Sequence, residues 1–577
     1  MHKNSKNNKN DTFLTFYKYN IFVTNKLIKN YFVLIFAMRN IKLYLLSIFV
    51  GCFASMFCVP FRYAIGWIAN IRPHLFKDTT NIFGLKIPYL SHIALLLAIY
   101  IVLLFVSLLI KYFPNIKGSG LPQTQALLYG RMVYKNPVQN LFVKFIGGLL
   151  SLSSGLSLGR EGTSVQIGSL TGYLTGNLFK VDKGKRRNLI AAGAGAGVSA
   201  AFTAPLSSAI LILESLQKFT LPQTIICTLL AGGTASIISG LILPTNIYSL
   251  IPIVTPKMEE WKLIIIFIIM GIYFAFLGKL FSIMLEKSRI WYNNLDSWKY
   301  KKYTHHTAFK IAFLTIITWA TGLFFPTMIG GDQTFLISHA TTSYSNILIL
   351  IALIILISLF TIISNASGFP GGIFLPMMTV GGLAGKLFYE IIKQLSGLLN
   401  IADTLGMHKL HILTQIGSSA ATDYNLSGYF MLIGMSAFFI SVVRTPLTGF
   451  ILISEMTGHY EVFFPTLIVG IMVFFLTQLL KVEPMNDLLY KFMIQSQTDE
   501  PPTTTLYVDV SPDSYFYGKT TETLQLPKEC TITEIYRGKK VIPFANGVSI
   551  SAGDQLSIVV QTKDLEKVHQ PLVSMGI

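Results

Sequence analysis

Residues 145–168 read FIGGLLSLSSGLSLGREGTSVQIG, and this stretch decides the fold class. Residues 145–159 carry no charge, and Arg160 and Glu161 then follow side by side, between Gly159 and Gly162. At membrane depth such side chains cost roughly 2.5–3.5 kcal/mol each on insertion scales, so they are functional candidates there. The question is therefore whether lipid surrounds this stretch. A structural Arg160–Glu161 ion pair is the alternative.

The composition of the chain indicates that lipid does surround it. Of 577 residues, 52% are apolar and 13% are charged, which is about half the charged share of an average soluble protein. The mean hydropathy is +0.56. A membrane-spanning helix needs roughly 20 apolar residues, and the sequence therefore predicts an all-α polytopic membrane protein. Its long runs without Lys, Arg, Asp or Glu are residues 43–61, 87–110, 219–256, 333–385 and 462–480.

The net charge of +19 would suggest nucleic-acid binding in a soluble protein, but its distribution argues against that partner. The first 43 residues carry eight Lys or Arg and one acid, Asp11. Other basic clusters, at 183–187 and 299–302, lie between apolar runs. Cytoplasmic loops of membrane proteins carry such an excess. We therefore expect a multi-pass protein of the cell membrane with a cytoplasmic N-terminus.

Three regions are expected along the chain. Residues 1–30 are rich in Lys and Asn and are expected to be a disordered cytoplasmic segment, and residues 31–495 form the membrane domain. Pro501-Pro502 suggests a linker. Residues 500–577 then alternate in the manner of strands, so they are expected to form a small α+β cytoplasmic domain. The expected strands are 505–510, 531–535, 540–544 and 555–560.

An internal similarity links two segments of the membrane region. Pro205-Leu206-Ser207 is followed by Glu214, and Pro446-Leu447-Thr448 is followed by Glu455, nine residues after each proline. Transporters built from two related halves leave such a trace, with their sites at the interface of the halves. A chance match of apolar sequence is the alternative.

A first glycine-rich motif is Gly118-Ser119-Gly120-Leu121-Pro122. Pro122 suits the first turn of a helix. The Ser119 hydroxyl, the accessible N–H groups beside Gly118 and Gly120 and the positive end of a helix together make an anion site without a full positive charge. A simple N-cap turn is the alternative.

Glu161 precedes a glycine and a Thr-Ser pair, so it too is placed at a helix N-terminus. A carboxylate there can occupy an anion site itself. Protonation would empty the site for a permeant anion, so that one side chain would act as gate and as proton carrier.

A third motif, GFPGGIFLP at residues 368–376, cannot continue a regular helix because it holds three glycines and two prolines. It follows an apolar run, so it predicts a helix that breaks inside the membrane and exposes the N–H groups of Ile373 and Phe374. A loop at the membrane surface is the alternative.

The fourth candidate is Tyr460, whose phenol can donate a hydrogen bond to an anion. An aromatic residue of the membrane interface is the alternative interpretation of this tyrosine.

In this order the four motifs resemble the CLC family of chloride channels and proton-coupled chloride transporters, over about residues 35–485. Gly118–Pro122 is similar to the family's GSGIP segment. Gly159–Gly162 is similar to its G(K/R)EGP segment, with Thr163 in place of the proline. Gly372–Pro376 matches its GxFxP segment, and Arg444–Tyr460 resembles the stretch that ends in the pore tyrosine.

The resemblance implies two inverted halves of tilted, broken helices and a homodimer with one anion pathway in each subunit. It implies Glu161 as the external gating glutamate, and the bound anion as chloride. The implied anion ligands are the hydroxyls of Ser119 and Tyr460 and the N–H groups of Ile373 and Phe374. The implied supporting turns contain Gly118, Gly120, Pro122, Gly159, Arg160, Gly162, Gly372 and Pro376.

One departure from the family concerns proton transfer. Transporters of the family often carry an internal proton-transfer glutamate near the end of the Pro205 segment, and the aligned position here is Ser215. A serine does not titrate near neutral pH. Either Glu214 or water substitutes, or coupling is weak, or the protein is a passive channel. Fluoride transport is a further alternative, which the intact Gly118–Pro122 segment disfavours.

The tail resembles the TrkA-C domain of ion-conductance regulators over residues 526–560, which implies a cytoplasmic regulatory or dimerising module with a small-molecule ligand left open. We expect no cofactor and no metal, because neither an HExxH motif nor another metal-ligand cluster is present. An intramembrane enzyme and a receptor-like protein are the rival classes.

Overall fold

The computed structural model describes residues 40–561, with internal gaps. The predicted disordered segment 1–30 and the Pro501-Pro502 linker lie outside the described residues. The gaps are residues 73, 75–87, 218–221, 244–249, 257–259, 298–302, 327, 331–332, 341–346, 405–419, 496–502, 511–513, 521–522, 525, 528–529, 538–539 and 545–546.

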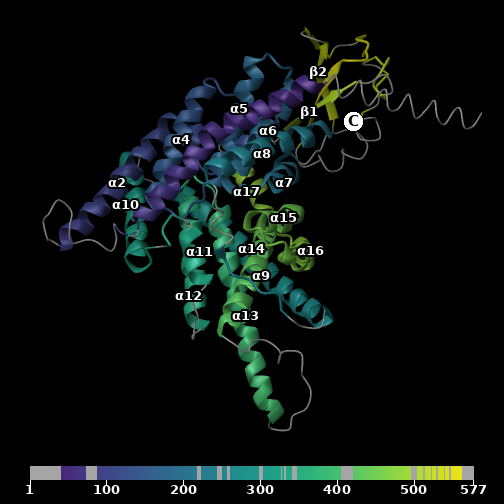
Figure 1. Cartoon of the computed structure of the whole chain (residues 1–577). Coiled ribbons are helices and arrows are strands. Elements are labelled where there is room, and N and C mark those ends of the chain that lie inside the picture. Colours follow the sequence, from purple (N-terminus) through teal and green to yellow (C-terminus); the bar gives the residue numbers. More distant parts are fainter. Residues whose placement is uncertain are drawn as a thin grey trace, which may run out of the picture.

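The first half of the membrane region contains long helices and a few short ones (Figure 1). A 33-residue helix, Asn40–Arg72, opens the described chain. The elements that follow are α2 (Pro88–Tyr112), η1 (Pro114–Ile116), α3 (Leu121–Leu128), α4 (Pro137–Ser153), α5 (Glu161–Leu178), α6 (Lys183–Phe202), α7 (Pro205–Leu211), the π-helical turn η2 (Ile212–Gln217) and α8 (Pro222–Ile242).

The second half likewise contains both long and short helices. Seven of the described helices are long and apolar enough to cross a membrane, as the composition predicts. Its elements are α9 (Glu260–Ser297), α10 (Tyr303–Phe324), α11 (Gln333–Ala340), α12 (Ile347–Ala366), α13 (Phe374–Thr404), α14 (Ala420–Val443), α15 (Pro446–Thr457), η4 (Tyr460–Val462), α16 (Phe463–Leu479) and α17 (Met485–Gln495).

Helices α3 and α7 have eight and seven residues, too few to cross a bilayer. Each starts with a proline in its first turn, as the sequence predicts for Pro122, because a proline there lacks only an N–H that the helix would leave unpaired. Such broken helices place their ends inside the protein, where they can line a site.

The glycines of α5 and α6 allow the backbones of these two helices to touch. A Cβ atom on Gly168 would collide with the carbonyl oxygen of Gly193, and one on Gly172 would collide with that of Leu189. In the second half, Gly381 of α13 and Gly434 of α14 approach each other in the same way. Small residues at these positions give membrane helices their close packing.

The two similar segments lie against each other and exchange caps. Glu214 accepts hydrogen bonds from the N–H groups of Leu447 and Thr448, at the start of α15. Glu455, at the end of α15, accepts hydrogen bonds from the N–H groups of Leu206 and Ser207, at the start of α7. This reciprocity is what a two-fold relation between the segments requires.

The described part of the tail is a four-stranded antiparallel sheet of order β1-β4-β2-β3. Its core includes Ile532, Ile535, Leu556 and Ile558, each at most 4% exposed. The predicted strands are confirmed to within two residues at each end. They are β1 (Thr503–Asp509), β2 (Cys530–Arg537), β3 (Lys540–Pro543) and β4 (Gln555–Gln561).

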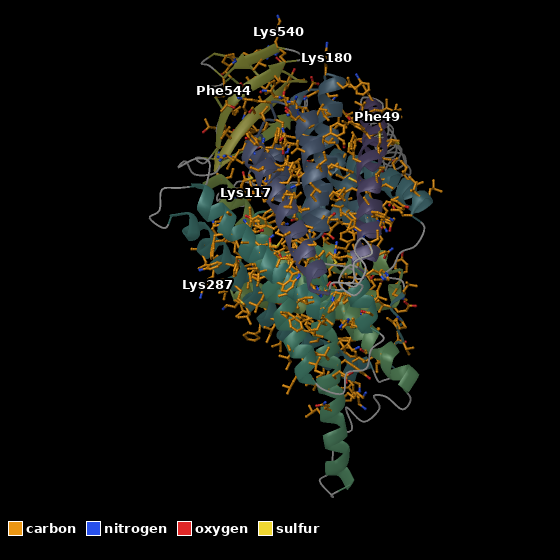
Figure 2. All side chains as sticks on the ribbon, turned by 90° about the vertical axis from the view of Figure 1, so that its left-hand side faces the viewer. Phe49, Lys117, Lys180, Lys287, Lys540 and Phe544 are labelled. Atoms are coloured by element: carbon orange, nitrogen blue, oxygen red, sulfur yellow. The ribbon has the colours of Figure 1, made fainter. Side chains whose placement is uncertain are left out.

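Both ends of the described chain lie at one end of the molecule. Lys540 of the tail and Lys180, just after α5, lie together at the top of Figure 2. The ring of Phe49, in the first helix, packs edge-on against Phe179 with centroids 5.9 Å apart. The start of the first helix, the end of α5 and the tail sheet therefore share this end.

Candidate functional site

Three glycine-rich turns far apart in the sequence meet at one place. The N–H of Gly118 donates to the oxygen of Gly368 at 2.8 Å, and the N–H of Gly371 donates to the oxygen of Gly118 at 3.3 Å. Gly159 and Gly372 exchange two N–H···O bonds of 2.6 and 2.7 Å. These four bonds join the first and second motifs to the third.

The first two motifs also touch each other directly. A Cβ on Gly162 would collide with the carbonyl oxygen of Ser119, and a Cβ on Gly120 would lie 2.7 Å from the oxygen of Gly162. Gly120 has a φ of 94°, which any other residue adopts only with strain. Only glycine permits this approach, so the residue type follows from the packing.

Three helices begin at this meeting point. The start of α3 follows Gly120, α5 starts at Glu161, and α13 starts at Phe374. Ile373 and Phe374 are each 1% exposed. The first-turn N–H groups of a helix have no acceptor in their own helix, and the helix dipole adds a partial positive charge at this end. The arrangement therefore favours a negative group.

Glu161 is the negative group that lies there, and it is 0% exposed. A Cβ on Gly159 would collide with one of its carboxylate oxygens, and a Cβ on Gly372 would lie 3.4 Å from the same oxygen. The carboxylate therefore folds back over the Gly159–Gly372 contact. The N–H groups of Glu161 and Leu375 interact with it, yet neither carboxylate oxygen has a well-formed hydrogen bond with the described residues.

Arg160 does not neutralise Glu161 through a direct ion pair. The side chain of Arg160 is 8% exposed, and among the described residues no hydrogen bond links it to the Glu161 carboxylate. The structural ion pair that the sequence leaves open is therefore not formed. A buried carboxylate without good partners is unfavourable. Because no strong bond holds it, such a group can change its position or its protonation state.

Ser119 is 3% exposed and lies between Gly118 and the start of α3. Its hydroxyl oxygen accepts a long bond of 3.4 Å from the N–H of Leu121. The hydroxyl proton remains available for another acceptor. The simple N-cap turn and the anion ligand are thus compatible at this residue.

Lys144 is a functional candidate that the motif search missed. It is 0% exposed on α4, and its ammonium group donates to the carbonyl oxygens of Ile116 and Gly118 at 2.9 and 2.8 Å. The Lys144 amino group therefore lies behind the Ser119 turn. The sequence does contain an indication of Lys144, since it is the only charged residue in residues 137–153. A charge in an apolar run is costly at membrane depth, and the same argument identifies Glu161.

Ser215 and Glu214 have different environments. Ser215 is 6% exposed, and its hydroxyl accepts a short hydrogen bond from the side-chain amide of Asn486. The carboxylate of Glu214 accepts the N–H of Leu447 at 3.2 Å and the N–H and hydroxyl of Thr448 at 3.0 and 2.7 Å. The Glu214 carboxylate is thus bound to the first turn of α15. This does not favour the alternative in which Glu214 carries protons.

Helix α17 is the second element that sequence reasoning missed. Its Asp487 accepts a bond of 3.5 Å from Gln125 of α3, and the ring of Tyr490 packs edge-on against Tyr129 at 5.8 Å. Asn486 is 2% exposed, and its side-chain oxygen has no partner among the described residues. No motif pointed to α17, because its role depends on which short helix it covers.

Tyr460 does not lie with these residues. It is 69% exposed, in the short η4 turn that packs on α14, α15 and α16. Gly458 ends α15 in the left-handed conformation, and the chain then turns outward. Tyr460 therefore lies on the apolar surface, as the alternative interpretation of an interfacial aromatic residue has it. It does not lie at the Ser119 turn.

Comparison with known proteins identifies this arrangement. Residues 101–478 match the family model described as voltage gated chloride channel, and residues 506–572 match the TrkA-C domain. The chain is 28% identical over 463 residues to the H(+)/Cl(-) exchange transporter ClcA of Citrobacter koseri, covering 78% of this chain and 88% of the relative. It is 27% identical over 462 residues to ClcA of Salmonella typhimurium, with the same coverage.

Solved structures agree in fold. A slow cyanobacterial Cl-/H+ antiporter superposes with a TM-score of 0.68 and 27% identity, covering 79% of this chain and 99% of that one. A eukaryotic CLC transporter superposes with a TM-score of 0.62 and 18% identity, covering 79% of this chain and 75% of that one; this second match shows the fold alone. Because the family model spans well over half of the chain and the three motif turns meet as the family resemblance implies, the chain belongs to the voltage gated chloride channel family, the CLC family.

Proposed function

We propose that this protein carries chloride across a membrane in exchange for protons, with Glu161 as gate and proton acceptor. The observation that supports this most directly is the buried Glu161 carboxylate, which lies where α5 and α13 begin and has no well-formed hydrogen bond in the part of the chain that the structure describes. Two helix N-termini stabilise a negative charge there, and they would do the same for a permeant anion when the carboxylate has left.

Chloride is the proposed anion. Both curated relatives are named as H(+)/Cl(-) exchange transporters, and the cyanobacterial antiporter of known structure moves the same two ions. In this chain the Ser119 hydroxyl and the N–H groups of Ile373 and Phe374 would donate to the anion. Lys144, behind the Ser119 turn, would add long-range attraction without filling the site. Polar N–H and O–H donors suit a weakly hydrated anion, because they hold it without trapping it.

The gate works by competition in this proposal. When ionised, the Glu161 carboxylate occupies the place between the two helix N-termini that an anion would take. When protonated, it loses its attraction to these positive ends and moves aside, and chloride replaces it. The same side chain would thus exchange one proton for access of the anion.

Proton passage on the Ser215 side needs water in this proposal. The Ser215 hydroxyl and the Asn486 amide can pass protons only along with water molecules, because neither titrates near neutral pH. Ser215 is therefore also the observation that favours a second candidate function, a passive chloride channel without proton coupling.

Two further expectations belong to the proposal. The chain would form a homodimer in a cell membrane, with both termini in the cytoplasm. The start of the first helix and the tail lie at the same end of the molecule. This supports the expectation that both termini are on the same side of the membrane. Exposed apolar residues on α7 and α15, such as Leu206 at 47% and Leu447 at 53%, are compatible with a subunit interface or with lipid.

The test is simultaneous recording of chloride flux and pH in liposomes that hold the purified protein. We expect a chloride gradient to drive protons against their own gradient. Glu161→Ala should remove this proton movement and retain chloride flux, because the site then stays open. Glu461→Ala, which removes an exposed carboxylate, is the matched control and should leave both fluxes unchanged.

The outcomes separate the candidates. A reversal potential that stays at the chloride equilibrium value under every pH gradient would establish the passive channel instead. Proton coupling that survives Glu161→Ala would remove Glu161 from the gate.

A further inference from the structure

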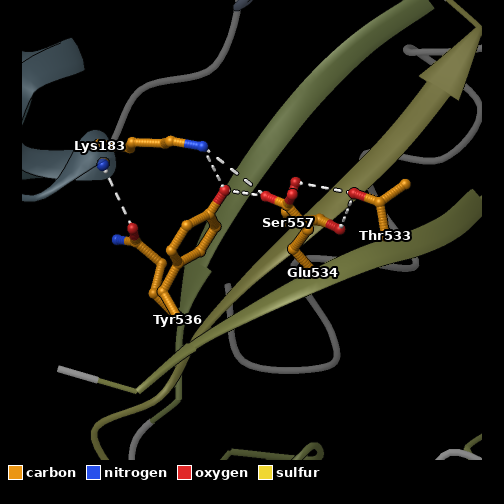
Figure 3. Close-up of polar contacts among 7 residues, drawn as sticks. Lys183, Thr533, Glu534, Tyr536 and Ser557 are labelled. Atoms are coloured by element: carbon orange, nitrogen blue, oxygen red, sulfur yellow. Dashed lines mark hydrogen bonds and ion pairs between the residues drawn. The ribbon is translucent and has the colours of Figure 1, made fainter. Parts of the chain in front are cut away.

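The tail sheet is fastened to the membrane domain at the first turn of α6. Lys183, the first residue of α6, donates to the phenol oxygen of Tyr536 at 2.7 Å and lies 3.7 Å from the carboxylate of Glu534 (Figure 3). Tyr536 donates its own proton to Glu534. The three side chains form one charge-assisted network between α6 and β2.

A second contact lies beside the first. The N–H of Gly184 donates to the side-chain oxygen of Gln555 at 3.2 Å. Tyr536 and Gln555 are opposite each other in the β2–β4 register, so both contacts come from one strip of the sheet. The N-cap residue of α6, Asp182, makes no side-chain cap bond. Gln555 of the tail therefore supplies the cap that the first turn of α6 lacks.

The same end of α6 holds the end of α5. Arg186 of α6 donates to the side chain of Asn177 at 2.6 Å and lies over the ring of Tyr173 at 5.3 Å. Farther along, the backbones touch where Gly168 meets Gly193. A displacement of α6 cannot be absorbed by side chains at this contact, because no side chains lie between the two backbones.

Helix α5 connects this contact to the gate. It has 18 residues, about 27 Å at 1.5 Å per residue, and its first residue is Glu161. From these contacts we infer that the tail domain, docked on α6, restrains α5 and so slows the movement of the Glu161 carboxylate. The inference rests on the proposed gate role of Glu161 and adds the tail as its regulator.

Docking has the properties of a reversible contact. The Lys183 and Glu534 side chains are 47% and 40% exposed, so their attraction is screened by salt and is weak enough to break. A docked and an undocked tail are then the two states that the gate would sense.

Docking is tested first, without any flux measurement. In a full-length variant whose native cysteines Cys52, Cys58, Cys227 and Cys530 are replaced by serine, Gly184→Cys and Gln555→Cys should form a disulfide under mild oxidation. Adding Lys183→Glu should lower the cross-linking yield at least threefold, and adding Glu534→Lys as well should restore it. A yield that Lys183→Glu leaves unchanged would overturn the docking contact.

Chloride flux in liposomes tests the regulation. Lys183→Glu should raise the chloride flux at least threefold, the charge swap with Glu534→Lys should return it to the wild-type rate, and the oxidised cross-link should hold it there. In a Glu161→Ala background Lys183→Glu should have no effect. An equal increase in that background would show that the tail acts elsewhere, and no increase in either background would overturn the inference. Because proton coupling in Glu161→Ala is read separately, a failure of the gate role is distinguished from a failure of the tail's role.

Discussion

Glu161 and Glu214 are two acidic side chains in the first half of the membrane domain, and their surroundings differ in burial and in hydrogen bonding. Glu161 is fully buried and has no well-formed hydrogen bond to any described residue, whereas Glu214 is partly buried and accepts three hydrogen bonds from the start of α15. Each lies near a helix N-terminus. The Glu214 carboxylate satisfies the first-turn donors of α15. The Glu161 carboxylate forms no well-formed bond with the first-turn donors of α5 and α13 among the described residues.

The comparison suggests a rule for this molecule. Where the carboxylate accepts well-formed hydrogen bonds from the donors around it, its charge fixes two helices to each other, and the site has one state. Where it does not accept such bonds, the carboxylate competes with other anions for the same donors, and the site has at least two states. Glu455 belongs with Glu214, because Leu206 and Ser207 satisfy it in the same way.

Stability gives the largest expected difference between the two carboxylates. Glu214→Ala leaves the N–H groups of Leu447 and Thr448 and the Thr448 hydroxyl without their acceptor, which should destabilise the protein by about 2–4 kcal/mol. Glu161→Ala removes an unfavourable buried charge and should be neutral or stabilising. Thermal unfolding of both variants in the same detergent measures the difference. Equal losses of stability would contradict the rule.

Lys144 tests how far the rule extends, because it is a buried ionisable group whose two hydrogen bonds are well formed. Its charge also acts at a distance on any anion held at the Ser119 turn. Lys144→Met should raise the half-saturating chloride concentration about tenfold, equivalent to about 1.4 kcal/mol.

Lys144→Arg is the matched control for that measurement, since it keeps the charge. If Lys144→Met lowers stability but leaves half-saturation unchanged, Lys144 follows the rule for Glu214 and only holds the turn in place.

The sequence is sufficient to predict those parts of the site that depend only on neighbouring residues in the chain. Glycine and proline break a helix wherever they cluster, so the turns around Gly118, Gly159 and Gly372 can be found without coordinates. The charge of Glu161 inside an apolar run can be found in the same way. That these turns meet follows only from the family resemblance, because the hydrogen bonds between them join residues distant in the chain.

The remainder depends on long-range packing. Glu214 is 234 residues from Thr448 and Asn486 is 271 residues from Ser215, so neither partner can be assigned from spacing. Tyr460 ends a segment that resembles the family, but the left-handed turn at Gly458 directs the chain outward. The position of a tyrosine along the chain does not predict in which direction the chain turns after the preceding helix ends.

Substitution can give position 215 the titratable side chain that Ser215 does not provide. Ser215→Glu would place a titratable group beside Asn486, and we expect the number of protons moved per chloride to increase at least twofold. Ser215→Gln, which has the same size and does not titrate, should leave the ratio unchanged. An equal effect of both substitutions would assign the change to packing around α17, and the contrast with Glu214 would then say nothing about protons.

The tail provides a partnered carboxylate outside the membrane, where the effect should be smallest. Asp554 is 1% exposed, and burial alone would raise its pKa. Hydrogen bonds from Arg537 and from the N–H of Ser551, together with the guanidinium charge, outweigh burial and hold the pKa of Asp554 below its usual range. A lowered folded-state pKa means that the ion pair stabilises the tail above about pH 4, the range of an unfolded aspartate, and that this stability is lost as the pH falls further.

The loss should be modest, because Arg537 is 45% exposed and its attraction is screened. Hydrogen exchange of the β2 and β4 amides in the full chain, followed from pH 6 to pH 3, should show wild-type protection decreasing toward that of Asp554→Asn. The variant lacks the contribution at every pH, so its profile should be flatter. Parallel profiles would mean that Asp554 is held by packing rather than by its charge, and the rule drawn from Glu161 and Glu214 would then apply only where lipid excludes water.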